Sequence, residues 1–381
     1  MIRVLIASAA YGGHNIGDDA ILTAMVEQLK GLEKSGISVV ITAVTRQPAE
    51  MAKRLGIRTL EFDGLGPRAR TYLAIATTDV LIVGGGALIA GHTRGWKGLV
   101  TGHPGYPMTM VTLAKLLRKR AMVSGADFEK IESPAARFLL RKVFDRTDMI
   151  TLRDENSKKR LIGDLDVRRA PVVTTADPVL ALQILSDQEV DTIAVRLDLE
   201  TAKRPLVVIN FAYGLDRRDM LIDLIAKTAD YAIEQFGARV LFVPMNILPS
   251  TDRFGMSQVI QRMAAPDSAS VLDVPYTHAE VLSAAHRSEL VISSRMHLLI
   301  MASLVGTPIC GISRVPKVDA FLERYGLEAA ANTEELEFKS FRSNLEAAWK
   351  ERSSIRARLE AGKNVLANLA RQSATCFTEI L

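Results

Sequence analysis

The sequence predicts an α/β protein built from two Rossmann-like domains that face a cleft, and three observations support this fold class. Short apolar runs alternate with segments of helical periodicity along most of the 381 residues. Glycine and proline separate many of these segments, as at Gly306-Thr307-Pro308. Aromatic residues make up only 6% of the chain, which favours helix-covered parallel sheets over a β-sandwich. A chain of this length is expected to form about two domains.

The first domain is expected to cover residues 1–190 and to begin with a strand at Val4–Ser8. The glycine loop Gly12–Asp19 follows and leads into an amphipathic helix. Asp18 or Asp19 falls at the N-cap or in the first turn, where carboxylates are favourable. The glycine spacing matches neither a dinucleotide-binding fingerprint nor a phosphate-binding P-loop. The loop therefore indicates either a close approach of a ligand to the backbone or a simple tight turn.

Three further features of the first domain follow predicted strands. The run Asp79–Val83 leads into Gly84-Gly85-Gly86, which would form a wall of backbone for a ligand or allow a helix to pack closely on the strand. The polar segment Gly91–Pro107 is long enough to suggest a functional loop. Arg153 follows the strand Met149–Leu152 at the same sheet edge, either as a ligand for substrate or in a surface salt bridge.

The second domain is expected over residues 200–340, after a charged stretch without a clear period. A long amphipathic helix, Phe341–Ile380, makes up most of residues 341–381 and is a candidate for packing back on the first domain. The apolar runs that we interpret as strands are Leu206–Ile209, Val240–Val243, Val271–Val274, Leu290–Ile292 and Ile309–Ile312.

A strand-to-helix junction within Glu289–Val318 breaks a rule of helix electrostatics. If Ser294 is the N-cap, Arg295 and His297 lie in the first turn, next to the positive end of the helix dipole. Two basic side chains together with free backbone N–H groups would form a pocket for an anion. In the alternative, Arg295 caps a neighbouring strand and His297 is a hydrogen-bonded histidine of the core.

Charge and cysteine content exclude several classes of protein. The 48 basic residues face 43 acidic ones, so the net charge of +5 allows an acidic substrate and does not by itself favour nucleic acid. Cys310 and Cys376 have no paired spacing, which indicates two reduced thiols in the cytoplasm. No apolar run approaches the ~18 residues of a membrane span. We expect a cytoplasmic protein without a metal site, and contact with the inner face of the membrane is left open.

Five short motifs occur in a fixed order along the chain. They are Asn15-Ile16-Gly17-Asp18-Asp19-Ala20-Ile21-Leu22, Gly84-Gly85-Gly86-Ala87-Leu88, Arg153-Asp154-Glu155-Asn156-Ser157, Ser293-Ser294-Arg295-Met296-His297 and Pro316-Lys317-Val318. From about residue 11 to residue 318 the chain thereby resembles the polysaccharide pyruvyl transferase family. Asp19 stands where the family usually has Glu, and Ala87 where it has Ser. The family often has Tyr-Asp before the last motif, where this chain has Ile312-Ser313-Arg314-Val315.

The resemblance implies a glycosyltransferase-B-like fold and a cofactor-free reaction. The pyruvyl group of phosphoenolpyruvate would be transferred to two hydroxyls of a saccharide as a cyclic ketal, with release of phosphate, in cell-surface or exopolysaccharide biosynthesis. The acceptor would be lipid-linked or nucleotide-linked. From the positions of the motifs we expect the first domain to hold the acceptor and the second domain to hold phosphoenolpyruvate. His297 and Arg295 are the candidate catalytic residues. The candidate substrate-binding residues are Lys317, Arg153, Ser294, Asn15, Gly17, Asp18, Gly85 and Gly86.

Two other functions fit the same sequence pattern. A glycosyltransferase or epimerase would use a sugar nucleotide on the same fold, and a non-catalytic relative would bind an anionic glycan. Release of phosphate from phosphoenolpyruvate on addition of an acceptor separates the pyruvyl transferase from both alternatives. The sequence leaves homo-oligomer formation open.

Overall fold

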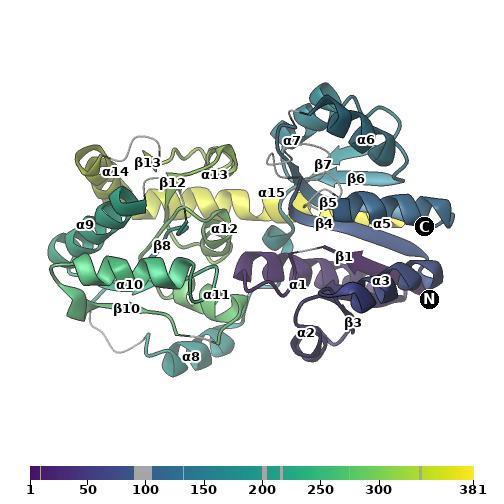
Figure 1. Ribbon diagram of the computed structural model, residues 1–381. Coiled ribbons are helices and arrows are strands. Elements are labelled where there is room, and N and C mark those ends of the chain that lie inside the picture. Colours follow the sequence, from purple (N-terminus) through teal and green to yellow (C-terminus); the bar gives the residue numbers. More distant parts are fainter. Residues whose placement is uncertain are drawn as a thin grey trace. The chain divides into compact units, whose positions relative to one another are not determined.

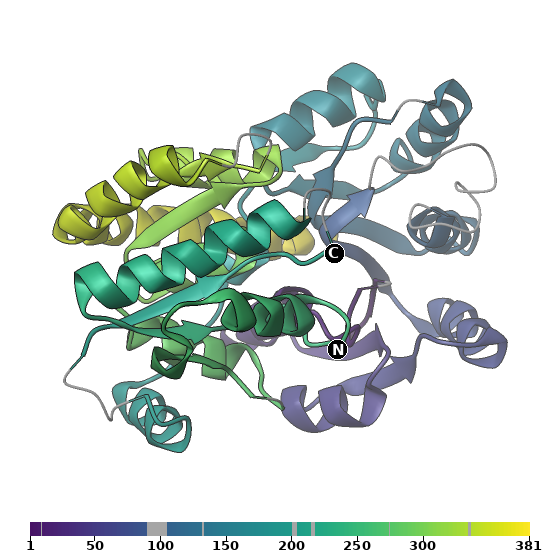
Figure 2. The same cartoon turned by 60° about the vertical axis from the view of Figure 1, so that its left-hand side comes forward.

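A computed structural model describes residues 1–8, 10–89, 105–131, 133–199, 204–214, 218–273, 275–333 and 337–381. The chain divides into two compact units. Unit 1 consists of Met1–Gln183 and Leu366–Leu381, and unit 2 of Ile184–Val365. Figures 1 and 2 show that each unit is a parallel sheet with helices packed against it, so the prediction of two Rossmann-like domains is confirmed. Most of the predicted loop Gly91–Pro107 lies outside the described residues.

The sheet of unit 1 has seven parallel strands in the order β3-β2-β1-β4-β5-β6-β7. The strands are β1 (Ile2–Ala7), β2 (Val39–Thr45), β3 (Arg58–Glu61), β4 (Val80–Ile89), β5 (Arg120–Phe128), β6 (Met149–Leu152) and β7 (Val172–Thr174). The chain moves outward from β1 to β3 and then continues from β4 on the other side of β1. The strand order therefore reverses between β1 and β4, the place where open α/β sheets bind ligands.

The helices of unit 1 connect these strands in regular alternation. They are α1 (Ile16–Gly31), α2 (Pro48–Leu55), α3 (Leu65–Thr77), α5 (Gly105–Leu116), α6 (Pro134–Phe144) and the short α7 (Glu155–Lys159). Buried strand residues such as Leu5, Val83 and Val123 pack with Met110 of α5 and Phe144 of α6 into one apolar core. This core fixes the strands, and with them the loops at their carboxyl ends.

The sheet of unit 2 has six parallel strands in the order β10-β9-β8-β11-β12-β13. They are β8 (Leu206–Asn210), β9 (Arg239–Phe242), β10 (Ala269–Val271), β11 (Leu290–Ser293), β12 (Ile309–Ser313) and the two-residue β13 (Ala331–Asn332). All five strands predicted for this domain are confirmed, although β10 begins and ends earlier than predicted. Here the strand order reverses between β8 and β11.

The helices of unit 2 include one that the sequence pattern did not indicate, α8, and two that we predicted as one, α14 and α15. They are α8 (Asp187–Arg196), α9 (Arg218–Phe236), α10 (Asp252–Arg262), α11 (His278–His286), α12 (Met296–Leu304), α13 (Pro316–Glu323), α14 (Phe338–Lys350) and α15 (Arg352–Glu379). The single predicted helix Phe341–Ile380 is wrong, because the backbone of Glu351, with φ −90° and ψ 10°, departs from helical geometry and separates α14 from α15. None of the described helices has the length and apolar character needed to cross a membrane.

Helix α15, yellow in Figure 1, contributes to both units. Its first residues belong to unit 2, and the segment from Leu366 onward belongs to unit 1. In unit 1 the Ser373 hydroxyl lies 3.2 Å from Thr151 Oγ1 and 3.4 Å from Thr175 Oγ1. The buried Phe377 lies in the same segment. Unit 1 is therefore assembled from both ends of the described chain.

Candidate functional site

The two glycine-rich motifs meet where the strand order of unit 1 reverses. Strands β1 and β4 are neighbours, with Ala7 opposite Val83, so the loop after β1 lies beside the glycines of β4. A Cβ atom built on Gly86 would lie 3.3 Å from Asp18 Oδ1. Asp18 is half-buried in the first turn of α1. The structure thus brings together three of the predicted substrate-binding residues, Asp18, Gly85 and Gly86.

Close packing explains two of the three consecutive glycines. Gly84, Gly85 and Gly86 have φ angles of 146°, 83° and 78°, which residues other than glycine rarely adopt. A Cβ at Gly84 would come within 2.4 Å of Ser124 O, and one at Gly85 within 2.4 Å of Ile21 Cγ2. At Gly86 the nearest atom is instead the Asp18 carboxylate. Strand β4 continues through all three glycines and does not end at Val83 as predicted.

Asn15, and neither of the aspartates, caps α1. The Gly17 N–H donates to Asn15 Oδ1 at 3.1 Å, which satisfies one of the free donors of the first turn. Asp18 and Asp19 both lie in that first turn, as predicted. The hypothesis that Asp18 caps its own helix is therefore wrong. Asn15 and Gly17, two predicted substrate-binding residues, make this cap with each other.

Asp19 closes the glycine loop from inside the protein. Its side chain accepts the Gly12 N–H at 2.8 Å and lies 3.9 Å from Arg54. Burial raises the pKa of Asp19 to about 6, and the nearby charge of Asp18 adds to this rise, while Gly12 and Arg54 oppose it. The loop therefore contains a carboxyl group with a raised pKa, which we did not predict from the sequence.

Arg153 lies in the interior of unit 1, where three aspartates surround it. Its guanidinium forms an ion pair with Asp127, lies 3.3 Å from Asp177 and 3.8 Å from Asp154, and its side chain is only 3% exposed. Burial lowers the pKa of Arg153, but the three carboxylates outweigh burial and raise it overall. The predicted alternative of a surface salt bridge is wrong. The geometry indicates that Arg153 organises the ends of β5 and β6. Its contact with substrate stays a prediction.

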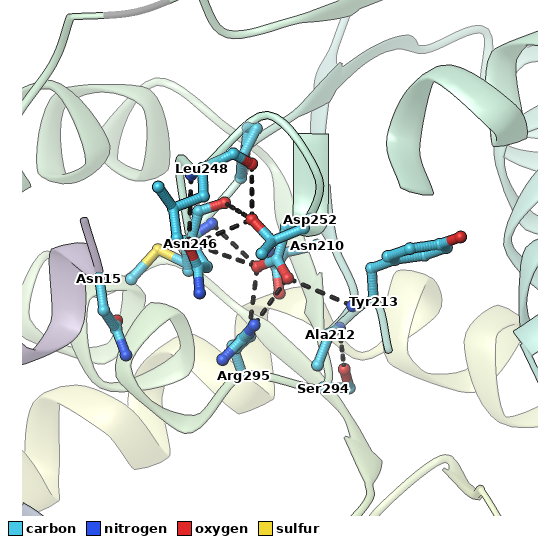
Figure 3. A network of polar contacts seen from close by, with 12 residues as sticks. Asn15, Asn210, Ala212, Tyr213, Asn246, Leu248, Asp252, Ser294 and Arg295 are labelled. Carbon is cyan, nitrogen blue, oxygen red and sulfur yellow. Dashed lines mark hydrogen bonds and ion pairs between the residues drawn. The ribbon is translucent and has the colours of Figure 1, made fainter. Parts of the chain in front are cut away.

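Two serines join the end of β11 to the last residue of β8 and to the segment that follows it, where the strand order of unit 2 reverses. Ser293 Oγ donates to Asn210 Oδ1 at 3.3 Å and accepts the Arg295 N–H at 2.9 Å. Ser294 Oγ accepts the Ala212 N–H at 2.9 Å (Figure 3). Ser294 is 1% exposed and is not the N-cap, because α12 begins at Met296 and Arg295 occupies the cap position. The predicted helix start is therefore one residue too early.

The side chain of Arg295 is held by Asp252, the first residue of α10 (Figure 3). Nε lies 3.1 Å from Oδ2 and Nη2 lies 2.6 Å from Oδ1, a side-on pair that joins two nitrogens to two oxygens. The Arg295 side chain at this helix start is thus paired with a carboxylate, and the alternative that Arg295 caps a neighbouring strand is wrong. Nη1 makes no hydrogen bond to any described residue. Arg295 is thus an oriented hydrogen-bond donor whose charge is balanced.

His297 and Lys317 occupy equivalent positions in consecutive strand-to-helix units. His297 is the second residue of α12, which follows β11, and Lys317 is the second residue of α13, which follows β12. Both side chains are half-buried. Neither helix has a side-chain cap at its N-terminus. At α13 the first residue is Pro316, which has no N–H, and Val318 donates its N–H to Val315 O at 3.0 Å. Strands β11 and β12 are neighbours, so these basic residues share one edge with Arg295.

The site in unit 2 therefore combines the oriented guanidinium of Arg295 with two further basic side chains, which suits an anion. Among the described residues, no group of three His, Cys, Asp or Glu side chains could hold a metal ion. Sequence reasoning missed Asp252. Its only local signal is an acidic residue at a helix start, which most often marks ordinary helix electrostatics.

Comparison with known proteins shows similarity in sequence and in fold. A family model described as polysaccharide pyruvyl transferase matches residues 15–314. No curated protein matches the chain significantly. A putative UDP-N-acetylglucosamine 2-epimerase from Listeria monocytogenes has a TM-score of 0.66 at 12% identity, over 97% of this chain and 94% of that one.

Two solved structures in complex with ligands have a similar fold. UDP-GlcNAc 2-epimerase from Neisseria meningitidis, bound to UDP-GlcNAc, has a TM-score of 0.64 at 12% identity and covers 100% of both chains. HepE from Anabaena, in complex with UDP-glucose, has a TM-score of 0.62 at 13% identity, also over 100% of both chains. These similarities extend over both units and confirm the fold.

Proposed function

Because the chain belongs to the polysaccharide pyruvyl transferase family, we propose that it transfers the pyruvyl group of phosphoenolpyruvate to two hydroxyls of a saccharide. The methylene carbon gains a proton, and the first hydroxyl forms a C–O bond to the neighbouring carbon. The second hydroxyl then forms another C–O bond at that carbon while the bond to phosphate breaks. The two hydroxyls release two protons. One makes up for the proton that the methylene carbon took up, and the other leaves with phosphate.

The observation that carries this proposal is the placement of Arg295, His297 and Lys317 at the starts of the helices that follow the neighbouring strands β11 and β12. Phosphoenolpyruvate carries a carboxylate and a phosphate, and both groups favour oriented N–H donors and fixed cations. Arg295 supplies a directed donor at α12, and Lys317 supplies positive charge at α13. We assign the anionic ends of phosphoenolpyruvate to these two residues.

His297 is our candidate for the proton transfers. It lies two residues after Arg295, in the first turn of α12, so it is close to the proposed anion site. An imidazole can donate a proton to the methylene carbon and accept one from a hydroxyl near neutral pH. If His297 is instead a hydrogen-bonded histidine of the core, replacing it should change the stability of the protein and not its turnover.

We assign the saccharide to the glycine-rich motifs of unit 1. The carboxylate of Asp18 lies beside Gly86, where no side chain intervenes. A carboxylate next to bare backbone is a suitable acceptor for sugar hydroxyl groups. A lipid-linked or nucleotide-linked saccharide of cell-surface polysaccharide biosynthesis is the expected acceptor class.

The test is release of inorganic phosphate from phosphoenolpyruvate in the presence of a panel of nucleotide-linked and lipid-linked saccharides. The expected result is acceptor-dependent phosphate release together with a product that has gained the pyruvyl ketal, read by mass spectrometry. Consumption of a sugar nucleotide without phosphoenolpyruvate would instead indicate a glycosyltransferase or epimerase. Binding of a glycan without turnover would indicate a binding protein.

A further inference from the structure

We propose that Asp252 is a positioning residue for this reaction. It fixes the direction of the Arg295 guanidinium and joins it to the segments that follow β8 and β9. The identity of the anion that Arg295 meets rests on the proposed function. The role of Asp252 itself rests on the contacts described below and shown in Figure 3.

The carboxylate of Asp252 makes its hydrogen bonds and its ion pair within the protein. Its side chain is 0% exposed, so it does not reach a substrate. Oδ1 accepts the Tyr213 N–H at 3.2 Å as well as Arg295 Nη2. Oδ2 accepts the Met245 and Asn246 N–H groups at 3.2 and 3.1 Å as well as Arg295 Nε. Five donors therefore converge on one carboxylate, which normally offers about four lone-pair sites.

The side-on pairing sets the direction of the remaining donors. Because Nε and Nη2 face Asp252, Nη1 necessarily points away from it. The Arg295 side chain is 20% exposed, so without this pairing the long side chain would sample several rotamers at the sheet edge. A planar guanidinium held on one side presents a fixed fork to a carboxylate or phosphate on the other.

Stability alone does not account for this arrangement. A buried ion pair contributes little net stability compared with packed apolar residues, because both charges lose their hydration. The three backbone donors come from two different segments, around Tyr213 after β8 and around Met245 after β9. Asp252 thus ties the guanidinium to both segments before any substrate binds. Such preorganisation is what binding and catalysis require of a supporting residue.

The experiment is a double-mutant cycle on phosphate release with the variants D252N, R295K and D252N/R295K. Each single variant is expected to lower kcat by about 10²-fold, the effect of misplacing a reacting group by about 1 Å. D252N leaves the charge of Arg295 unbalanced, so its KM for phosphoenolpyruvate should stay the same or fall. If Asp252 acts through Arg295, the double variant should be no slower than the slower single variant.

Three results would overturn the proposal. The first is a loss of kcat in the double variant equal to the product of the two single losses. The second is a kcat of D252N equal to that of the wild type. The third is a loss of activity in D252N that a smaller folded fraction explains entirely. D223N serves as the matched control, because Asp223 is exposed and pairs with Arg262 in the same unit. It should retain wild-type kinetics. If D252N does not fold, R295Q and D252N/R295Q replace it, and their kcat values should be equal; a further loss in the double variant contradicts the proposal.

The same cycle separates this proposal from the proposed function. If the wild-type protein releases no phosphate but converts UDP-glucose, the proposed function is wrong. The positioning role of Asp252 is still supported if the double variant converts UDP-glucose no more slowly than the slower single variant. If there is no turnover at all, the cycle is read as affinity for phosphoenolpyruvate by calorimetry. Wild-type protein without affinity for phosphoenolpyruvate or UDP-glucose would overturn both.

Discussion

Gly86 lies directly against the carboxylate of Asp18, with the site of its missing Cβ atom 3.3 Å from Oδ1. This relationship connects two motifs that are separated by more than sixty positions in the printed sequence. It also divides the triple glycine into two parts. Gly84 and Gly85 are required by packing, whereas a Cβ atom on Gly86 would contact the Asp18 carboxylate and, at 3.6 Å, Ile21 Cδ1.

Gly85→Ala is expected to destabilise the protein by about 2–5 kcal/mol, from left-handed strain of roughly 1–2 and overpacking of about 1–3. The clash would be with Ile21 and with Tyr11 Oη, 2.6 Å from the new Cβ. Gly36→Ala is the matched control, because Gly36 has a similar φ of 79° but open space around it. The free energy of unfolding of both variants, measured by chemical denaturation, separates the cost of the clash from the cost of the backbone strain. Equal losses would show that packing at Gly85 is unimportant.

Asp18→Asn is expected to weaken binding of the saccharide acceptor while leaving the melting temperature nearly unchanged. Asn15 caps α1, so the charge of Asp18 is not needed to satisfy the helix N-terminus. KM values for acceptor and phosphoenolpyruvate, measured together with thermal unfolding, check this outcome. A lowered melting temperature with unchanged acceptor KM would assign Asp18 to the stability of the helix.

Asp19 should make the folded protein less stable as pH rises from about 4 to above 6. Its folded pKa of about 6 exceeds the ordinary value of 3.8, so the native state binds the extra proton in this interval. The difference corresponds to about 3 kcal/mol, present as a penalty above pH 6. Asp19→Asn should remove most of this slope in denaturation curves at pH 4 to 7. A slope identical to that of the wild type would show that Asp19 remains ionised throughout.

Asp79 provides a control of opposite sign for that experiment. Its hydrogen bond and ion pair with Arg3 lower its pKa to about 2. Asp79 therefore contributes stability that is present above about pH 4 and is lost as pH falls towards 2. Asp79→Asn should change the acid limb of the stability profile and leave the interval around pH 6 unaltered.

Lys317→Ala is expected to raise KM for phosphoenolpyruvate more than KM for the acceptor. The loss of one charge-assisted contact should cost about 1.5–3 kcal/mol. Lys317 is a cleaner test than Arg295, since Arg295→Ala would also leave the buried Asp252 without its ion pair. Lys339→Ala, on the exposed side of α14, is the control. Equal weakening for both substrates would argue against a phosphoenolpyruvate site at α13.

His297→Ala should lower kcat by ~10²–10⁴-fold, the usual contribution of a general acid–base group. The variant should remain folded and still bind phosphoenolpyruvate, although less tightly. His286→Ala, at the exposed end of α11, is the matched control and should keep the wild-type rate. Near wild-type turnover of the His297 variant would show that another group transfers the proton.

The sequence indicated the sheets well because buried strands are continuous apolar runs with glycine or proline at their ends. The apolar runs located the strands, whereas the order of the strands in each sheet, and with it the two positions of reversal, comes from the structure. The partners of Arg295 and Arg153 could not be predicted, since each arises from residues that only the tertiary fold brings together. Asp252 lies 43 positions before Arg295, and Asp127 lies 26 positions before Arg153. Sequence patterns over a few neighbouring residues do not indicate which distant residues form such pairs.

Helix α8 was missed for a different reason, because only Val190 and Ala194 of its residues are buried and the apolar period is weak. Its one clear signal was the capping box of Ser186 and Glu189, in which each side chain binds the backbone N–H of the other residue. Weighing caps together with periodicity would have located this helix.

The assembly of unit 1 from two distant segments affects how the protein can be made on a ribosome. Residues 1–183 emerge first, but Ala370 and Phe377 of α15, both buried in the finished unit, are synthesised nearly two hundred residues later. Until then the apolar surface that they cover is open, and the hydroxyl cluster of Thr151 and Thr175 lacks Ser373. The nascent first half should therefore depend on chaperones and remain sensitive to proteases, while unit 2 can complete its sheet earlier.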